Sequence, residues 1–175
     1  LVGSEMCIRD SYQKMRIRVL FDPNVDPYGS GYHVIQSKIA IGSGGFFGKG
    51  LFAGTQSQLN FLPENHTDFI FSVVGEELGF VGAMFLLFLF FIVLYRTLLI
   101  ARNTTDRFGS LMAVGIMSMW LFQVLINAGV TLGTMPVTGI PFPFMSYGGS
   151  ALVMNFMCVG LLMNIFMRRQ KLLFE

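Results

Sequence analysis

Charged residues are scarce in this chain of 175 residues. Asp, Glu, Lys and Arg together make up 13% of it, about half of the share that is usual in soluble domains. Hydrophobic residues make up 53%, and the formal net charge at pH 7 is +2. This balance excludes intrinsic disorder, which requires low hydrophobicity and high net charge, and it offers no basic excess suited to a nucleic-acid partner. The composition is that of a membrane protein.

Cysteine is also scarce. The two cysteines, Cys7 and Cys158, are far apart in the sequence, so no disulfide framework is indicated. Residues 1–11 share no compositional continuity with the rest, and we interpret them as a foreign stub. The chain begins without Met or a signal peptide, and nothing before residue 68 is apolar enough to cross a membrane. The sequence therefore predicts at least one further span upstream.

Long stretches without charge indicate the membrane spans. Neither Leu78–Tyr95 nor Phe108–Met167 contains Asp, Glu, Lys or Arg. A bilayer core of about 30 Å needs about 20 helical residues. The runs are continuously apolar instead of alternating, which favours helices over a β-barrel. The sequence predicts an all-α polytopic membrane protein with three transmembrane helices, at residues 68–95, 111–132 and 151–167.

Basic residues in the connecting segments set the orientation. Residues 96–110 and the tail 168–175 carry Lys and Arg, whereas residues 133–150 carry neither. Short basic loops stay in the cytoplasm, which places residues 12–67 and 133–150 outside. The outer loop 133–150 is rich in Gly and Pro, and we expect it to pack on the mouth of the helix bundle. The third span is short and is expected to borrow residues from Tyr147 to Ser150.

Cysteine labelling tests this orientation. Single cysteines at positions 60 and 140 are expected to react with a membrane-impermeant maleimide in intact cells, because both positions lie in the predicted outer segments. If both stay silent until the cells are permeabilised, the orientation is the reverse.

A glycine-rich passage around Lys49, IGSGGFFGKGLFAGTQ, follows a short predicted helix at residues 32–41. Its glycines would let backbone N–H groups and Lys49 approach a phosphate. The passage does not match a Walker A loop, because Ser43 stands in place of the first Gly and Gly50 in place of Ser or Thr. A flexible hairpin at the membrane surface is the alternative interpretation.

Titratable residues gather where the chain enters the first span. The block LPENHTDFIF carries Glu64, His66 and Asp68, and Glu76 and Glu77 follow. Ionisable groups at membrane depth are costly and usually face a polar cavity. Asp68 is a candidate proton acceptor or ligand of a divalent cation, Mg²⁺ or Mn²⁺. Alternatively it caps the N-terminus of the helix. Because Glu76 and Glu77 are adjacent, only one of them is expected to face the interior.

Two long blocks of the sequence resemble the SEDS family of cell-wall polymerases. They are HVIQSKIAIGSGGFFGKGLFAGTQSQLNFLPENHTDFIFSVVGEELGFVG and NAGVTLGTMPVTGIPFPFMSYGGSALVMNF, and the resemblance extends over residues 12–175. The stretches GSGG, GKG, GTQSQL and MPVTGIPFPFMSYGGS are similar to the rod-shape branch of the family and less so to its division branch. Family members have ten helices with both ends cytoplasmic. The resemblance implies that this chain holds the last three helices and the large outer loop before them.

The resemblance also implies an activity, that of a peptidoglycan glycosyltransferase at the outer face of the bacterial cytoplasmic membrane. Its substrate would be lipid II, the disaccharide peptide carried on undecaprenyl pyrophosphate. The family's essential acidic residue lies in the HTDF block, which is Asp68 here. Candidate substrate-binding residues in the same outer segment are Lys49, Gln56, Glu64 and His66, with Lys49 expected near the leaving pyrophosphate.

Partners and competing functions follow from the same resemblance. The implied partners are a class B penicillin-binding protein and the MreBCD elongation machinery, in the elongation of rod-shaped cells. A lipid II flippase and a non-enzymatic membrane scaffold of the elongation complex are the alternative functions.

Overall fold

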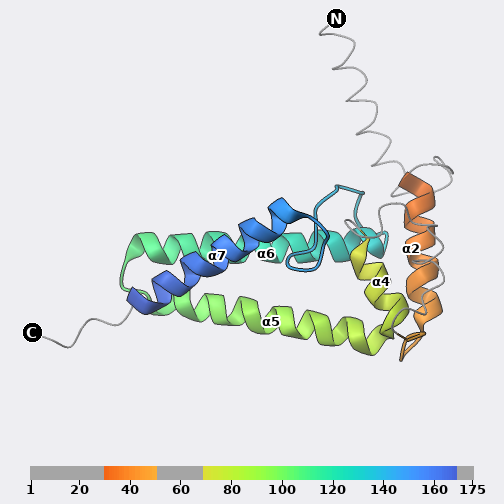
Figure 1. Ribbon diagram of the computed structural model, residues 1–175, viewed down its shortest axis with the longest axis horizontal. Helices are drawn as coiled ribbons and strands as arrows, with labels where there is room; N and C mark the ends of the chain where they lie inside the picture. The colour runs from red at the N-terminus through yellow and green to blue at the C-terminus, as the bar shows by residue number, and fades with distance from the viewer. Residues whose placement is uncertain (1–29, 51–68, 169–175) are drawn as a thin grey trace, which may run out of the picture.

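The computed structural model describes residues 30–50 and 69–168 of the chain, which form helices and contain no strand. The helices, drawn in Figure 1, are α2 (Ser30–Gly44), α4 (Ile70–Glu77), α5 (Gly79–Asn103), α6 (Arg107–Thr131) and α7 (Gly149–Arg168). The all-α fold predicted from the sequence is confirmed, and the short helix predicted at residues 32–41 is present as α2.

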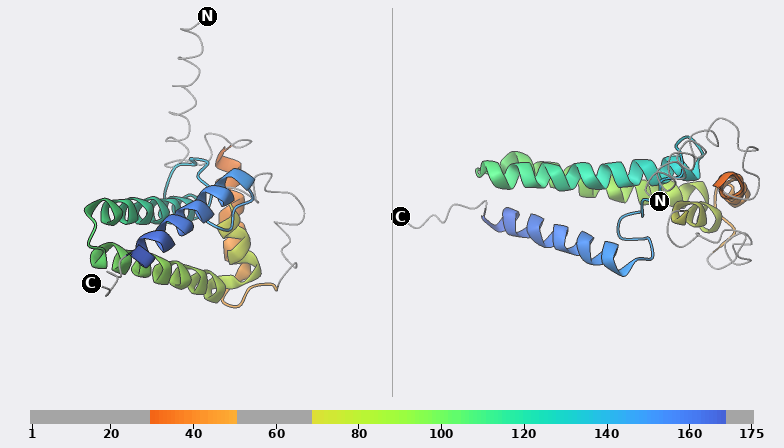
Figure 2. Two further views of the ribbon diagram at one scale, coloured as in Figure 1. Left: turned by 60° about the vertical axis from the view of Figure 1, so that its left-hand side comes forward. Right: turned by 90° about the horizontal axis from the view of Figure 1, so that it is seen from above.

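The helices form a bundle with a cap at one end. Helices α5 and α6 run antiparallel beside each other, and α7 packs against both (Figure 1). Figure 2 shows α2 standing across the end of the bundle at which α5 begins and α6 ends. The short helix α4 joins this cap to α5 and contacts α2. We call this the outer end, because the charge pattern places it outside.

Helices α5, α6 and α7 are each long and apolar enough to cross a membrane. Helix α5, with 25 residues, is roughly 37 Å long at 1.5 Å per residue. Large apolar side chains such as Phe85, Phe91 and Phe122 are exposed on these helices, as expected of surfaces that face lipid or other membrane helices. The three spans predicted from the uncharged stretches are confirmed.

The boundaries of the first span differ from the prediction. Where the sequence predicts one helix over residues 68–95, the structure has α4 and α5, which meet at Gly79. Gly79 has φ +67°, a conformation that interrupts a right-handed helix. At the other end α5 continues to Asn103. Arg96 and Arg102 do not end the helix, because long basic side chains can extend from it toward the headgroups.

The second span begins earlier than the predicted residues 111–132. Helix α6 begins at Arg107 because Asp106 is its N-cap, with side-chain oxygens that accept from the amides of Phe108 and Gly109. These bonds satisfy two of the free N–H groups at the start of the helix. The predicted loop 96–110 is therefore mostly helical.

The outer loop 133–150 packs on the bundle, as predicted. Phe142 is 1% exposed and lies between an aromatic ring of α4 and one of α5. Its ring centroid is 6.1 Å from that of Phe71 and 5.0 Å from that of Phe90. Helix α7 begins at Gly149, so the third span does borrow residues from the end of this loop.

Near the middle of the bundle, one buried hydrogen bond joins α6 to α7. The indole Nε1 of Trp120 donates to Oδ1 of Asn155 at 2.8 Å, and both residues are buried. The surrounding core consists of Ala101, Ala113, Ile116, Trp120, Cys158 and Leu162. Because a buried indole N–H needs an acceptor, this bond fixes the rotation of α7 against α6.

A double-mutant cycle tests this contact. We expect Trp120→Phe and Asn155→Leu to be coupled by about 1 kcal/mol in the free energy of unfolding, the size typical of polar contacts between membrane helices. The measurement is unfolding of the detergent-solubilised protein. Strictly additive effects of the two substitutions would show that the hydrogen bond does not form.

Candidate functional site

A tight loop, Gly45–Gly50, leaves α2 and crosses the point where α4 meets α5. We call it the glycine loop. It belongs to the glycine-rich passage around Lys49, of which residues 41–50 are described. Figure 1 shows it at the outer end, beside the start of α5. Two interpretations were open for it, a phosphate cradle and a flexible hairpin.

Backbone hydrogen bonds join the glycine loop to both helices. At the end of α4, the carbonyl oxygens of Glu76 and Glu77 accept from the amides of Lys49 and Gly50, each at 3.0 Å. Free carbonyls at the end of a helix need such partners. The loop therefore caps the C-terminus of α4.

The same loop also caps the N-terminus of α5. The amide of Phe80 donates to the carbonyl of Gly45 at 3.0 Å, and the amide of Val81 donates to the carbonyl of Phe46 at 3.1 Å. These amides belong to the first turn of α5, which has no intrahelical acceptor for them. One loop thus satisfies the ends of two helices, and this explains why the predicted single helix is broken here.

Close approach of the backbones requires glycine at several of these positions. A Cβ added at Gly48 would collide with the carbonyl of Glu77, and one at Gly44 with the carbonyl of Gly75. Gly79, with its positive φ, has the amide of Gly48 against the place of its missing side chain. The glycines serve the fit of loop to helix.

The close contact between the glycine loop and the two helices changes both interpretations of the loop, the phosphate cradle and the flexible hairpin. The amides of Lys49 and Gly50 bind α4, and the amide of Gly48 donates to the carbonyl of Gly44 at 2.8 Å. These three amides are therefore not directed at a phosphate. The loop is not a free hairpin either, although Phe46 and Phe47 extend from it and are 74% and 86% exposed.

The side chain of Lys49 forms an ion pair with Glu76. Its Nζ lies 3.1 Å from Oε1 of Glu76, with side-chain exposures of 30% for the lysine and 0% for the glutamate. Glu77 is only half-buried. The prediction that one of the two adjacent carboxylates faces the interior is confirmed, and that residue is Glu76.

The other predicted site residues, Gln56, Glu64, His66 and Asp68, lie outside the described residues. Their roles in substrate or metal binding and catalysis stay predictions, as does the role of Lys49 at a pyrophosphate. Within the described ranges, no group of three or more His, Cys, Asp or Glu side chains is placed to hold a metal ion.

The residue after Asp68 is firmly placed. Phe69 is 1% exposed and packs with Val130 of α6. Its carbonyl accepts from the amide of Ser72 at 2.9 Å and from the hydroxyl of Ser72 at 2.6 Å. The start of α4, which directly follows Asp68 in the sequence, is therefore anchored in the core.

Helix α2 is held against the outer end of α6. The hydroxyl of Ser37 donates to the carbonyl of Thr131 at 2.7 Å, and both residues are fully buried. The side chain of Lys38 covers Gly133, where an added Cβ would meet its Cε and Nζ. A cation beside the C-terminus of a helix is favourable, so Lys38 stabilises this contact.

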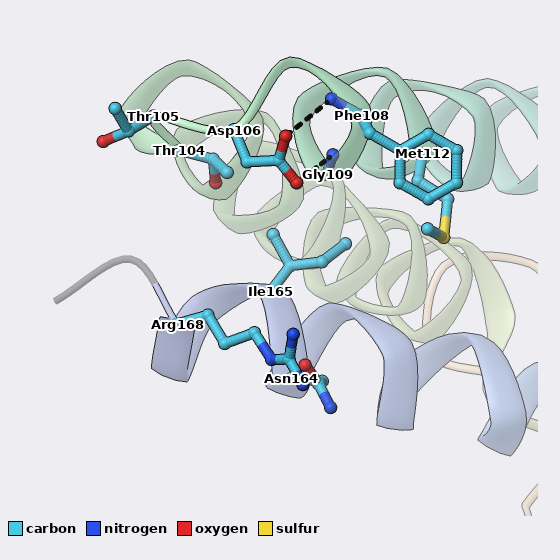
Figure 3. A pocket seen from close by; sticks show the side chains of 9 residues that line it. All are labelled: Thr104, Thr105, Asp106, Phe108, Gly109, Met112, Asn164, Ile165 and Arg168. Carbon is cyan, nitrogen blue, oxygen red and sulfur yellow. Dashed lines mark hydrogen bonds between the residues drawn. The ribbon is translucent and has the colours of Figure 1, made fainter. Parts of the chain in front are cut away.

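The opposite end of the bundle has a separate cavity of about 450 Å³. Figure 3 shows Asp106 on one wall, bonded to the amides of Phe108 and Gly109, and Asn164 and Arg168 on the other wall. This cavity lies at the predicted cytoplasmic end. It is remote from the glycine loop and is not part of the candidate site.

The sequence of the chain agrees with one protein family. The chain matches the FtsW/RodA/SpoVE family of cell cycle proteins over residues 3–171. It belongs to this family. The interpretation of residues 1–11 as a foreign stub stays a prediction, and those residues lie outside the described part of the chain.

Relatives within the FtsW/RodA/SpoVE family include enzymes of cell-wall synthesis. The peptidoglycan glycosyltransferase MrdB of Escherichia coli K12 is 52% identical over 161 residues, which are 92% of this chain and 44% of MrdB. The peptidoglycan glycosyltransferase RodA of Treponema pallidum is 48% identical over 154 residues, or 88% of this chain and 36% of that protein. The chain thus spans less than half the length of these relatives.

Two solved structures share the fold of this chain. A chain from a peptidoglycan synthase complex that coordinates polymerization and crosslinking aligns with TM-score 0.71 and 34% identity, covering 91% of this chain and 43% of that one. A mutant of the rod shape determining protein RodA from Thermus thermophilus aligns with TM-score 0.60 and 37% identity, over 77% of this chain and 40% of that one. Together with its three apolar helices, family membership makes this a multi-pass protein of the bacterial cytoplasmic membrane.

Substitution of Gly79 tests the fit of the glycine loop. Gly79→Ala is expected to destabilise the protein by about 1–3 kcal/mol, because an alanine there has a positive φ and meets the backbones of Gly48 and Phe46. The measurement is the unfolding midpoint of the solubilised protein.

The matched control is Gly42→Ala, in α2. A Cβ at Gly42 has nothing within 4 Å, so this change should be neutral or stabilise by up to about 1 kcal/mol. Equal effects of the two substitutions would contradict the close packing at the α4–α5 break.

Proposed function

We propose that this chain is part of a peptidoglycan glycosyltransferase that polymerises lipid II during elongation of rod-shaped cells. The observation that carries the proposal is 52% identity over 92% of the chain to the peptidoglycan glycosyltransferase MrdB of Escherichia coli K12. The structure supports it with three helices long and apolar enough to cross a membrane, as a substrate carried on a lipid requires.

The proposed reaction centres on Asp68. Its carboxylate would accept the proton of the 4-hydroxyl of the acceptor sugar while that oxygen attacks the anomeric carbon of the donor. Undecaprenyl pyrophosphate leaves from the opposite face, so the new linkage is inverted to β. Support comes from position: residue 68 directly precedes Phe69, which the core holds fixed.

A divalent cation and the protein partners belong to the proposal as well. Mg²⁺ or Mn²⁺ prefers carboxylate oxygens, and Asp68 would be the ligand to test. The proposed partners are a class B penicillin-binding protein and MreBCD. The first is supported by the structural neighbour, which comes from a complex that coordinates polymerization and crosslinking.

The test is Asp68→Asn in an active full-length chimera, in which residues 12–175 replace the matching part of Escherichia coli MrdB. The rate at which purified chimera in detergent joins lipid II into glycan strands is expected to fall by about 10²–10⁴-fold, the usual effect of losing a general base. Detergent removes the second compartment that a flippase needs.

Asp106→Asn is the matched control, because it makes the same chemical change at the opposite end of the bundle, where Asn also serves as an N-cap. It should polymerise at the unmutated rate. Normal strand synthesis by the Asp68→Asn chimera would refute the proposed catalytic role. A chimera with no polymerase activity that still restores rod growth would favour the scaffold.

A further inference from the structure

The cavity at the predicted cytoplasmic end, shown in Figure 3, lies between the start of α6 and the end of α7 and has a volume of about 450 Å³. Helix α5 ends at Asn103, α6 begins at Arg107 and α7 ends at Arg168. All three helices are long and apolar enough to cross a membrane, so the cavity lies where they leave the bilayer. Phospholipid headgroups occupy this depth.

Opposite charges line the two walls of the cavity. The carboxylate of Asp106 lies on the α6 side, and the guanidinium of Arg168 lies on the α7 side (Figure 3). Within the described ranges, neither side chain forms an ion pair, with the other or with a third residue. A cation and an anion held apart on facing walls are complementary to a ligand that carries both charges.

Asp106 is held in place and can still accept further hydrogen bonds. Its Oδ1 accepts from the amide of Phe108 at 3.2 Å, and its Oδ2 accepts from the amide of Gly109 at 3.3 Å. A carboxylate has about four lone-pair positions, so roughly half of its capacity remains for a donor in the cavity. The two amide bonds fix the direction in which the carboxylate points.

The α7 wall offers donors suited to a phosphate. The guanidinium of Arg168 has five N–H groups in a planar fork, which can hold two phosphate oxygens at once. Asn164 is four residues earlier and lies on the same face of the helix, where its side-chain amide can donate to a third oxygen. Both residues line the cavity.

Apolar side chains line the part of the cavity that is deeper in the membrane. Phe108 and Met112 are one turn apart on the same face of α6, and Ile165 faces them from α7. Ile165 also packs against the core cluster around Trp120. Because these residues follow the charged rim toward the middle of the bundle, they are suited to the first carbons of acyl chains below a headgroup.

We infer that this cavity binds the headgroup of a zwitterionic phospholipid with a primary ammonium, phosphatidylethanolamine. Arg168 binds the phosphate, and Asp106 accepts from the ammonium. The inference does not depend on the proposed glycosyltransferase function. The site is separate from the proposed reaction centre and takes no part in lipid II polymerisation measured in detergent, where Asp106→Asn is the control.

Other headgroups fit the two walls less well. Phosphatidylglycerol has a net negative charge and no cation, so it leaves the carboxylate of Asp106 facing a phosphate. Phosphatidylcholine carries a cation, but its quaternary ammonium has no N–H to donate to the carboxylate. Phosphatidylethanolamine supplies a phosphate for Arg168 and an N–H donor for Asp106.

The experiment measures lipid binding to the delipidated full-length chimera in detergent by native mass spectrometry. The three phospholipids are compared with identical palmitoyl and oleoyl chains. Phosphatidylethanolamine is expected to bind about fivefold more tightly than phosphatidylcholine or phosphatidylglycerol, the effect of one additional charged contact near the membrane surface.

Two substitutions are expected to act in different ways. Arg168→Gln should weaken binding of all three lipids by about fivefold, because all of them carry a phosphate. Asp106→Asn keeps an N-cap but removes the negative charge. It should lower the affinity for phosphatidylethanolamine to that for phosphatidylcholine and raise the affinity for phosphatidylglycerol.

Arg102→Gln is the matched control. It makes the same change as Arg168→Gln at an exposed arginine of the same end of the bundle that is not among the residues lining the cavity. Its affinity for each lipid should stay within about twofold of that of the unmutated chimera. The unfolding midpoint of each variant is measured alongside, so that a loss of folded protein is not mistaken for a loss of binding.

Four results would overturn the inference. The first is equal affinity of the unmutated chimera for phosphatidylethanolamine and phosphatidylcholine. The second is an unchanged preference for phosphatidylethanolamine in Asp106→Asn, and the third is the same affinity for it in Arg168→Gln and Arg102→Gln. The fourth is tightest binding of phosphatidylglycerol, or displacement by chain-free glycerophosphoethanolamine as effective as by the whole lipid, which would make the ligand an anionic lipid or a soluble zwitterion.

Discussion

The outer end of this protein depends on one constraint: the free backbone groups of two helix ends must be satisfied next to a membrane. Helix α4 ends and α5 begins at Gly79, and unpaired carbonyls and amides there would be costly. The glycine loop meets both needs, since it donates to Glu76 and Glu77 and accepts from Phe80 and Val81. The break in the helix and the path of the glycine loop are therefore two aspects of one contact.

This contact is one of several that hold the described elements of the outer end together. Ser37 and Thr131 join α2 to α6, Phe142 fills the space between α4 and α5, and the Lys49–Glu76 pair joins the loop to α4. Preorganisation of this kind would matter for the proposed transferase reaction, because small displacements of a reacting group lower the rate sharply. The lipid-facing helices, in contrast, need only apolar surface.

Much of the fold could be predicted from the sequence, because uncharged stretches indicate the membrane spans and basic loops indicate their orientation. The break at Gly79 could not, since a loop about thirty residues away in the chain caps it and local patterns do not show such partners. The early start of α6 had a visible signal, the N-cap Asp106. At the site, the adjacency of Glu76 and Glu77 predicted that only one of them faces inward. The pairing of Glu76 with Lys49, 27 residues away, required the structure.

Hydrogen–deuterium exchange resolved at single amides tests the central claim, the docking of the glycine loop on the α4–α5 break, most directly. In the intact protein in nanodiscs, the amides of Lys49, Gly50, Phe80 and Val81 are expected to exchange slowly, because all four donate to backbone carbonyls. Exchange at Lys49 and Gly50 as fast as in an unstructured peptide would contradict the account.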